Sequence, residues 1–375
     1  MRFLRKARVK ELGGVALLRL DFNTEDEWRM AASLPTVNFL RERARCLVIV
    51  SHRGRPEGVR FTWGVPEHFD KKLSLREDAK ALSRLIDRTV VFVPHFRFED
   101  IKRQISESPK GSVLLLENMR FLPGEEKNDA KFARELASLA DYYVNDAFAV
   151  SHRANASIVA VTKLLPSYAG LGLEGELAAL TKVMKSPKRP FVVIIGGAKV
   201  QDKIGVISSL RRVASTFLVG SGPARSLLQA KGERIGKDIF PIQPKELPAI
   251  RRVAKYKNLV LPVDYVIHER AVRDVGRETL KQFDAYIAKA RTIIWNGPLG
   301  FIEQEPYEQG TLHIAKAIGE NKKAFSIAGG GETVMFLKQY KLDTKFSFVS
   351  TGGGAMLDFL AGKKLPGIIA LERSK

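Results

Sequence analysis

Short apolar runs rich in β-branched residues recur along the chain, and they limit its fold more than any other feature. The runs are nearly continuous rather than alternating, which is typical of strands buried on both faces of a parallel sheet. They occupy residues 15–20, 46–50, 90–93, 113–116, 142–144, 191–195, 216–219, 259–263, 292–295, 325–328 and 346–349. Helical patterns separate many of them, at residues 34–45, 76–86, 130–140, 202–213, 277–290, 307–318 and 333–340. This alternation predicts an α/β fold, and the number of strands predicts two open sheets.

Composition predicts a soluble, cytosolic protein with more than one globular domain. The chain has 375 residues, of which 45% are hydrophobic and 27% are charged, which excludes a disordered chain, a collagen and a disulfide-stapled miniprotein. No apolar run reaches the roughly 18 residues of a spanning helix, and the basic start does not have the pattern of a signal peptide. Cys46 is the only cysteine, so an intramolecular disulfide is excluded, and we expect this residue in the core.

The net charge of +21 predicts anionic partners, which include nucleic acid, phosphorylated metabolites and acidic surfaces. A nucleic-acid-binding arm usually concentrates its charge in one segment. No run of five like charges occurs here, so the excess is spread along the chain. This distribution favours a general bias of the surface over a dedicated nucleic-acid arm.

A domain boundary is predicted at residues 164–175, where one proline and several glycines gather. A helical pattern follows at residues 174–185, and a second segment with two prolines comes before the next strand. The helix between these segments is either a rigid connector between domains or an ordinary crossover helix, and the pattern favours neither.

The first half of the chain places polar and charged side chains directly after its predicted strands. Ligands of open α/β sheets bind beyond the carboxyl ends of the strands, so these side chains are candidates for one shared site. Forked arginine donors match phosphate and carboxylate oxygens, and several arginines in one cleft need an anion to offset their repulsion. Separate surface salt bridges are the alternative, which the number of arginines disfavours. The candidates are Asp21, Asn23, His52, Arg55, Arg120, His152 and Arg153.

Glycine-rich segments follow the predicted strands of the second half. Glycine lets the backbone approach a ligand closely and exposes N–H groups. In residues 329–333 the glycines come directly before a helical pattern, whose amino end would attract phosphate. Lys199 and Lys203 lie four residues apart and can share a helix face. We therefore expect a nucleotide phosphate site, with Glu332 as a candidate metal ligand and Glu303 as a candidate ribose acceptor.

Two widespread nucleotide-binding motifs do not explain this site. The G-x-x-x-x-G-K-[ST] loop is absent. Residues 170–175 match G-x-G-x-x-G, but no apolar strand pattern precedes them and no acidic residue lies about twenty positions further on, so we interpret the match as accidental. An anion site in one half and a nucleotide site in the other together indicate phosphoryl transfer, which depends on positioning and charge neutralisation.

At these residues the sequence resembles the phosphoglycerate kinase family over essentially the whole chain, with the motifs in the family's order. The matching segments are residues 19–23, 29–36, 51–56, 114–121 with 125–128, 144–148, 152–153, 196–204, 261–264, 295–300, 329–333 and 350–355. The resemblance implies two doubly wound, Rossmann-like parallel-sheet domains joined by a connecting helix and hinge. It implies a phosphoglycerate-binding domain at residues 1–168 with 356–375, the hinge at 169–186, and a nucleotide-binding domain at 187–355.

The resemblance also implies the reaction: Mg²⁺-dependent, reversible transfer of the acyl phosphate of 1,3-bisphosphoglycerate to ADP, on domain closure. Arg29 and Lys199 would neutralise the phosphoryl group in transfer, and Glu332 would hold Mg²⁺. The implied 3-phosphoglycerate site comprises Asp21, Asn23, Arg29, His52, Arg55, Arg120, His152 and Arg153. The implied ATP/ADP site comprises Lys199, Lys203, Asn296, Glu303, Gly330, Gly331, Glu332 and Thr333. The implied enzyme is a cytoplasmic monomer without membrane or nucleic-acid partners.

Four positions depart from the family's pattern. Glu332 replaces the aspartate of Gly-Gly-Gly-Asp-Thr, which predicts retained activity with an altered metal or nucleotide affinity. Residues 220–223 read Gly-Ser-Gly-Pro, and Arg277 follows Gly276 where proline is usual, so base preference is open. Phe348 replaces the histidine before the Val-Ser-Thr-Gly-Gly-Gly segment, so the behaviour of the hinge on closure is open.

Two alternatives to an active kinase stay open at the level of sequence. A catalytically weakened relative is motivated by Glu332, and a large gain in turnover from Glu332→Asp would support it. A nucleic-acid-binding protein is motivated by the net charge alone, because no recognition helix, aromatic RNA-binding pattern or basic arm occurs. Salt-sensitive gel shifts would detect such binding.

Overall fold

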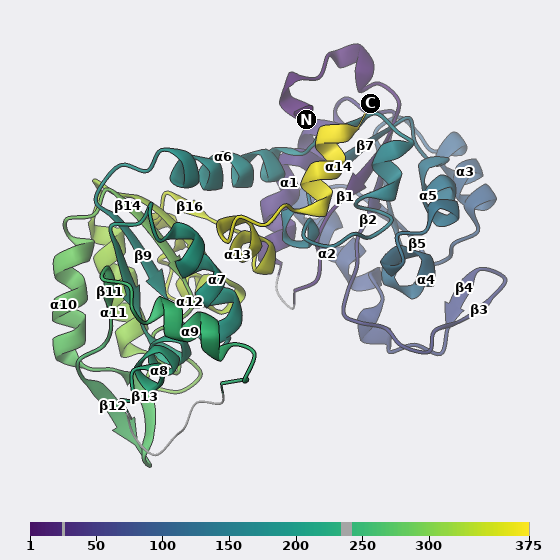
Figure 1. Cartoon of the computed structure of the whole chain (residues 1–375). Helices are drawn as coiled ribbons and strands as arrows, with labels where there is room; N and C mark the ends of the chain where they lie inside the picture. The colour runs from purple at the N-terminus through teal and green to yellow at the C-terminus, as the bar shows by residue number, and fades with distance from the viewer. Residues whose placement is uncertain (25–26, 234–241, 375) are drawn as a thin grey trace. The chain divides into compact units, whose positions relative to one another are not determined.

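The computed structural model describes residues 1–24, 27–233 and 242–374, and within them the chain divides into two compact units (Figure 1). The first unit comprises Met1–Leu177 with Lys364–Lys375, and the second comprises Ala178–Lys363. None of the helices in the described ranges is long and apolar enough to cross a membrane.

The first unit is built on a parallel sheet of six strands in the order β5-β6-β2-β1-β7-β8. The strands are β1 Val15–Arg19, β2 Cys46–Val50, β5 Val90–Val93, β6 Ser112–Leu116, β7 Tyr142–Asn145 and β8 Ser167–Ala169. The helices are α1 Trp28–Arg41, α2 Arg76–Ile86, α3 Phe98–Glu107, α4 Pro123–Glu126, α5 Ala130–Ala137 and α14 Pro366–Arg373, and β3 Arg60–Thr62 pairs with β4 Val65–Glu67 as a hairpin. The central strands β1 and β2 are buried throughout, as their continuous apolar runs predict.

The second unit has a parallel sheet in the order β11-β10-β9-β14-β15-β16. Its strands are β9 Phe191–Ile195, β10 Thr216–Val219, β11 Leu259–Val260, β14 Thr292–Asn296, β15 Phe325–Gly329 and β16 Phe348–Val349. Its helices are α7 Val200–Leu210, α8 Ser221–Ala230, α9 Leu247–Val253, α10 Arg277–Ile287, α11 Gln309–Glu320, α12 Gly331–Gln339 and α13 Gly354–Leu360. Counted within the unit, the order is 3-2-1-4-5-6, so the strand order reverses between β9 and β14. An antiparallel hairpin of β12 Tyr265–His268 and β13 Ala271–Val275 stands beside this sheet.

The two parallel sheets confirm the predicted doubly wound α/β fold. Helix α6 (Leu171–Lys185) follows the last strand of the first sheet and precedes the first strand of the second, and the division between the units falls within it. Near the other end of the chain, α14 belongs to the first unit, where the Gly367 N–H donates to the Ser151 carbonyl at 2.9 Å. Residues 356–363, which we expected in the first domain, lie in the second compact unit.

The G-x-G-x-x-G match at residues 170–175 lies at the start of α6. Contrary to the expectation, a strand does precede it, since β8 ends at Ala169. Its first glycine leaves room for an acidic side chain, because a Cβ on Gly170 would meet the Asp146 carboxylate at 2.5 Å. The Leu173 N–H donates to Asp146 Oδ1 at 2.8 Å. The space that a pyrophosphate would need is therefore filled by a side chain of the protein.

Candidate functional sites

In the first unit, a basic cluster forms at the carboxyl edge of the sheet around His52. This residue follows β2 and is 1% exposed. Its Nδ1 lies 3.1 Å from Nη2 of Arg19, the last residue of β1. The pKa of His52 is held well below its ordinary value by burial first, and then by the positive charges of Arg19, Arg120, Arg153 and Arg29. The ring is therefore neutral, and four guanidinium groups gather around it.

Asp21 positions several groups of this basic cluster. It lies two residues after the end of β1, and its Oδ2 accepts a hydrogen bond from Arg29 Nη1 at 2.7 Å. Its Oδ1 accepts from the backbone N–H of Asn23 at 3.0 Å and lies 3.7 Å from His52 Nδ1. The Asn23 amide oxygen in turn accepts from the Gly54 N–H at 2.7 Å. One carboxylate thus fixes Arg29 and the loop after β1.

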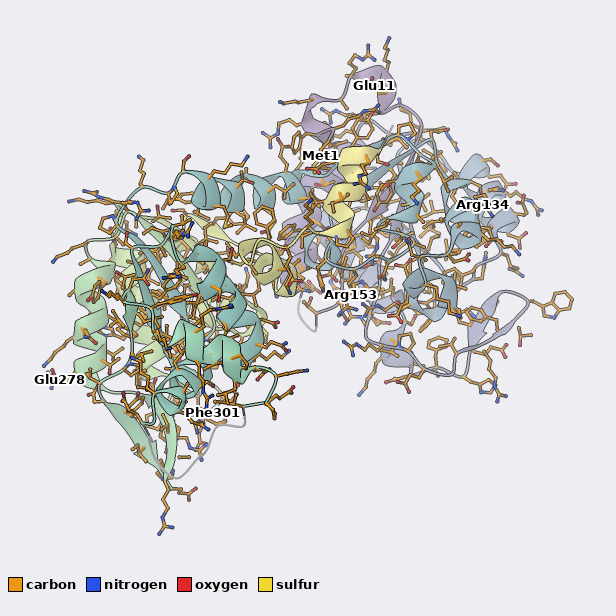
Figure 2. All side chains as sticks on the ribbon, in the orientation of Figure 1. Met1, Glu11, Arg134, Arg153, Glu278 and Phe301 are labelled. Atoms are coloured by element: carbon orange, nitrogen blue, oxygen red, sulfur yellow. The ribbon has the colours of Figure 1, made fainter. Side chains whose placement is uncertain are left out.

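The other predicted arginines differ in how far the structure ties them to the cluster. Arg120 is 7% exposed and donates to the Gly54 carbonyl. Burial and the nearby Arg153 lower the pKa of Arg120 to about 10. Arg153, labelled in Figure 2, lies beside His152, with 3.4 Å between its Nε and the histidine Nε2. Arg55 is exposed, and its side chain makes no hydrogen bond or ion pair within the described ranges.

Arg19 is the member of the cluster that the sequence did not suggest. It is 1% exposed, and its Nε donates to Ser157 Oγ at 2.9 Å. The Ser157 hydroxyl donates to Glu125 Oε1 at 2.6 Å, and the same carboxylate oxygen lies 3.9 Å from Arg19 Nη2. A charged residue inside an otherwise apolar strand is the signal that could have identified it, because a buried charge needs a partner.

In the second unit, a buried lysine lies where the strand order reverses. Lys203 on α7 is 6% exposed, and its ammonium donates to the Asn296 side-chain oxygen at the end of β14. Burial lowers the pKa of Lys203 to about 8, and the negative charge of Glu332 opposes this shift. Lys199 is exposed directly before α7, and its charge adds to the lowering of this pKa. The two lysines predicted to share a site are thus electrostatically coupled.

The glycine loop before α12 is held against the same strand end. Gly330 has a φ of 97°, in the region that favours glycine, and a Cβ there would meet the Asn296 side chain at 3.2 Å. Thr333 is buried, and its hydroxyl accepts from the Gly297 N–H at 2.9 Å. Gly331 and Glu332 are exposed at the start of α12. The helix therefore presents its amino end beside Asn296 and Lys203.

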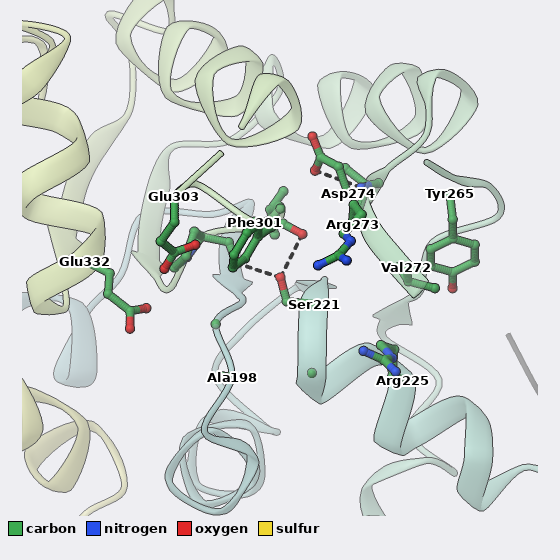
Figure 3. Close-up of a pocket in the computed structure, with 16 residues that line it drawn as sticks. Ala198, Ser221, Arg225, Tyr265, Val272, Arg273, Asp274, Phe301, Glu303 and Glu332 are labelled. Carbon is green, nitrogen blue, oxygen red and sulfur yellow. Dashed lines mark hydrogen bonds between the residues drawn. The ribbon is translucent and has the colours of Figure 1, made fainter. Parts of the chain in front are cut away.

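A cavity of about 240 Å³ adjoins these groups (Figure 3). Glu332 and Glu303 line it together with the backbone of Gly197 and Ala198, while Arg225, Tyr265 and Arg273 line the other side. Ser221 has a φ of 48°, in the region that favours glycine. Its hydroxyl donates to the carbonyls of Pro298 at 2.8 Å and Leu299 at 2.7 Å, which fixes this strained turn in the cavity wall.

Glu332 is the cavity carboxylate beside the glycine loops, where a metal would be needed. Within the described ranges, no three His, Cys, Asp or Glu side chains gather as a metal cage. Mg²⁺ in phosphoryl-transfer sites is held by one or two carboxylates together with substrate phosphates, so a single Glu332 fits such a site. The position of a Cβ on Gly197 would lie 3.9 Å from Glu332 Oε2, so this carboxylate faces the glycine loop after β9.

Both the sequence and the fold are similar to those of phosphoglycerate kinases. The family model for phosphoglycerate kinase matches residues 12–363. A phosphoglycerate kinase from Dictyoglomus turgidum is 40% identical over 96% of both chains. One from Pseudothermotoga lettingae is 36% identical over 99% of this chain and all of its own.

Two solved structures of phosphoglycerate kinases match the fold over nearly the whole chain. The one from Coxiella burnetii superposes with a TM-score of 0.80 at 32% identity, over 99% of both chains. The one from Pyrococcus horikoshii has a TM-score of 0.86 at 30% identity, over 99% of this chain and 98% of its own. The function is accordingly that of a glycolytic kinase, which transfers a phosphoryl group between a nucleotide and phosphoglycerate. The chain belongs to the phosphoglycerate kinase family.

Proposed function

We propose that the basic cluster of the first unit binds 3-phosphoglycerate or 1,3-bisphosphoglycerate. The observation that carries this proposal is the gathering of Arg19, Arg29, Arg120 and Arg153 around a neutral His52. An anion between these guanidinium groups would offset their repulsion. Asp21, Asn23, Arg55 and His152 complete the proposed site.

The cavity and lysines of the second unit are the proposed site for ATP or ADP. Lys203, Asn296 and the loop of Gly330, Gly331 and Thr333 would hold the nucleotide phosphates, and Glu303 the ribose. Glu332 would hold Mg²⁺, which when bound neutralises phosphate charge. The two compact units would accordingly be the phosphoglycerate-binding and nucleotide-binding domains, with α6 as their connector.

The proposed reaction is a direct, in-line transfer. The carboxylate of 3-phosphoglycerate is already a nucleophile in the direction that consumes ATP, so no general base is required. Arg29 and Lys199 would neutralise the phosphoryl group while it moves. Because the two proposed sites belong to different units, the units would have to close to bring the substrates together and exclude water. We further propose that the enzyme is a monomer and that it acts in the cytoplasm, where glycolysis takes place.

A coupled assay tests the proposed function. Mg²⁺-dependent consumption of ATP with 3-phosphoglycerate is followed through glyceraldehyde-3-phosphate dehydrogenase and NADH oxidation. We expect turnover in the wild type and a loss of about 100-fold or more in kcat/KM for Arg29→Ala, because a charge-neutralising group is removed. Arg84→Ala is the matched control, since Arg84 is exposed and its side chain pairs with Glu27 at the surface. Wild-type turnover that survives Arg29→Ala would contradict the role of Arg29.

A further inference from the structure

The nucleotide cavity carries a feature that the proposed function does not use: an arginine at the end away from Glu332. Glu332 and Glu303 lie on one side of the cavity, and Arg273 and Tyr265 lie across it (Figure 3). The phosphates belong beside Glu332, so the opposite end receives the nucleobase. Arg273 therefore lies where a base would be recognised.

The backbone fixes Arg273 at this position. It is the third residue of β13, and its carbonyl accepts a hydrogen bond from the Phe301 N–H at 2.8 Å. Its guanidinium carbon lies 5.6 Å from the centre of the Phe301 ring and 6.0 Å from that of Tyr307. Two aromatic rings thus lie within cation–π distance of the guanidinium and limit its movement.

The guanidinium of Arg273 forms no hydrogen bond with the residues that the structure describes. Its Nε is buried and has no hydrogen-bond partner among the described residues. The neighbouring carboxylate of Asp274 is engaged elsewhere, because its oxygens accept from the N–H groups of Val275 at 2.8 Å and Gly310 at 2.7 Å. No ion pair joins Arg273 to a carboxylate within the part of the chain that the structure describes. A buried donor without a partner favours a ligand that brings an acceptor.

The chemistry of the bases decides which ligand fits. Arginine only donates, and its fork matches two neighbouring acceptors. Guanine and hypoxanthine present O6 and N7 side by side, whereas adenine presents N7 beside an amino group that also donates. We propose that Arg273 recognises the O6/N7 edge of a 6-oxopurine, so that this kinase prefers guanine or hypoxanthine nucleotides to adenine nucleotides. This inference rests on the proposed nucleotide site.

Binding of nucleoside diphosphates tests the proposal without turnover. Calorimetric titration with ADP, GDP and IDP in the presence of Mg²⁺ gives the three dissociation constants. We expect GDP and IDP to bind at least about fivefold more tightly than ADP, which is the lower end of the discrimination that a bidentate arginine gives. IDP lacks the 2-amino group, so equal binding of GDP and IDP would assign the preference to O6 and N7.

Two variants of Arg273 and one control variant show whether this residue determines the nucleotide preference. Arg273→Leu should abolish the preference, and Arg273→Lys should reduce it, because lysine keeps the charge but lacks the fork. Arg291→Leu is the control, since Arg291 is exposed in the same unit and precedes β14 at the other edge of the sheet. A wild type that prefers ADP, or an equal loss of all three nucleotides in Arg273→Leu, would overturn the assignment. If the wild type binds none of the three, the proposed nucleotide site itself fails, whereas unchanged ratios in the variants refute only Arg273.

Discussion

At the scale of the residue, Glu332 stands where the pattern of the phosphoglycerate kinase family has aspartate. Its carboxylate faces the loop at Gly197 and lies close enough to Lys203 to act on that residue's pKa. Aspartate would withdraw the carboxylate by one methylene, roughly 1.5 Å, and Mg²⁺ tolerates little change in ligand position. We therefore expect Glu332→Asp to raise the Mg²⁺ concentration at half-maximal activity several-fold, with kcat at saturating Mg²⁺ nearly unchanged. A magnesium titration of the coupled assay measures both quantities.

Glu303→Gln is the control for this change, because Glu303 lines the same cavity but is the proposed ribose acceptor. It should raise KM for the nucleotide and leave the magnesium dependence unchanged. A gain of orders of magnitude in kcat for Glu332→Asp would instead show that the natural glutamate weakens the enzyme.

Position after a strand was enough to predict much of the basic cluster, but not its buried support. Asp21, His52 and Arg120 follow parallel strands, and parallel strands end at one edge of a sheet. Arg19 was missed because it is the last residue of an apolar strand, and its partners Ser157 and Glu125 lie more than 100 residues away. Such a pairing depends on packing between distant segments, which no local pattern contains.

At the scale of the element, the predicted strands were recovered where they are buried, and the missed helices have few apolar residues or contain glycine and proline. Helix α3 buries only Ile101 and Ile105, so its apolar stripe is narrow. Helix α8 begins at the Gly-Ser-Gly-Pro segment, which has the composition of a turn, although proline is tolerated in a first turn. Helix α1 begins at Trp28, six residues before the predicted start, and contains Pro35. Proline opposed α1, and glycine with proline opposed α8, so tertiary packing decided the outcome at these two helices.

Asp146 links the end of β7 to the start of α6, and it predicts a dependence of stability on pH. Burial raises the pKa of Asp146 from 3.8 to about 6. The folded state therefore binds this proton more tightly than the unfolded state, so the wild type loses stability as the pH rises between these values. Asparagine cannot ionise and still accepts from the Leu173 N–H. We expect the free energy of unfolding of Asp146→Asn, relative to the wild type, to rise by about 1 kcal/mol from pH 5 to pH 7.

Urea unfolding at both pH values measures this difference. Asp87→Asn is the matched control, because Asp87 is exposed in a left-handed conformation that asparagine also adopts, so its difference from the wild type should not change with pH. A constant difference for Asp146→Asn would show that the carboxyl group is ionised without penalty.

At the scale of the whole molecule, the net charge of +21 belongs to no single site. Its excess positive charge attracts polyanionic substrates over distances that depend on salt, because the Debye length is about 8 Å at 0.15 M and about 30 Å at 0.01 M ionic strength. Charges far from the basic cluster should therefore contribute at low salt only. Arg88 and Lys110 are exposed and precede β5 and β6, at the edge of the sheet opposite to His52. A strand of five residues separates these edges by about 16 Å.

The double variant Arg88→Glu with Lys110→Glu lowers the net charge by four without touching the cluster. We expect its KM for 3-phosphoglycerate to be about twofold above that of the wild type at 0.01 M ionic strength and equal to it at 0.15 M, with kcat unchanged. The coupled assay at both salt concentrations measures this, and Arg88→Lys with Lys110→Arg controls for the substitution itself. If KM is unchanged at both salt concentrations, the charges of Arg88 and Lys110 have no part in capturing the substrate.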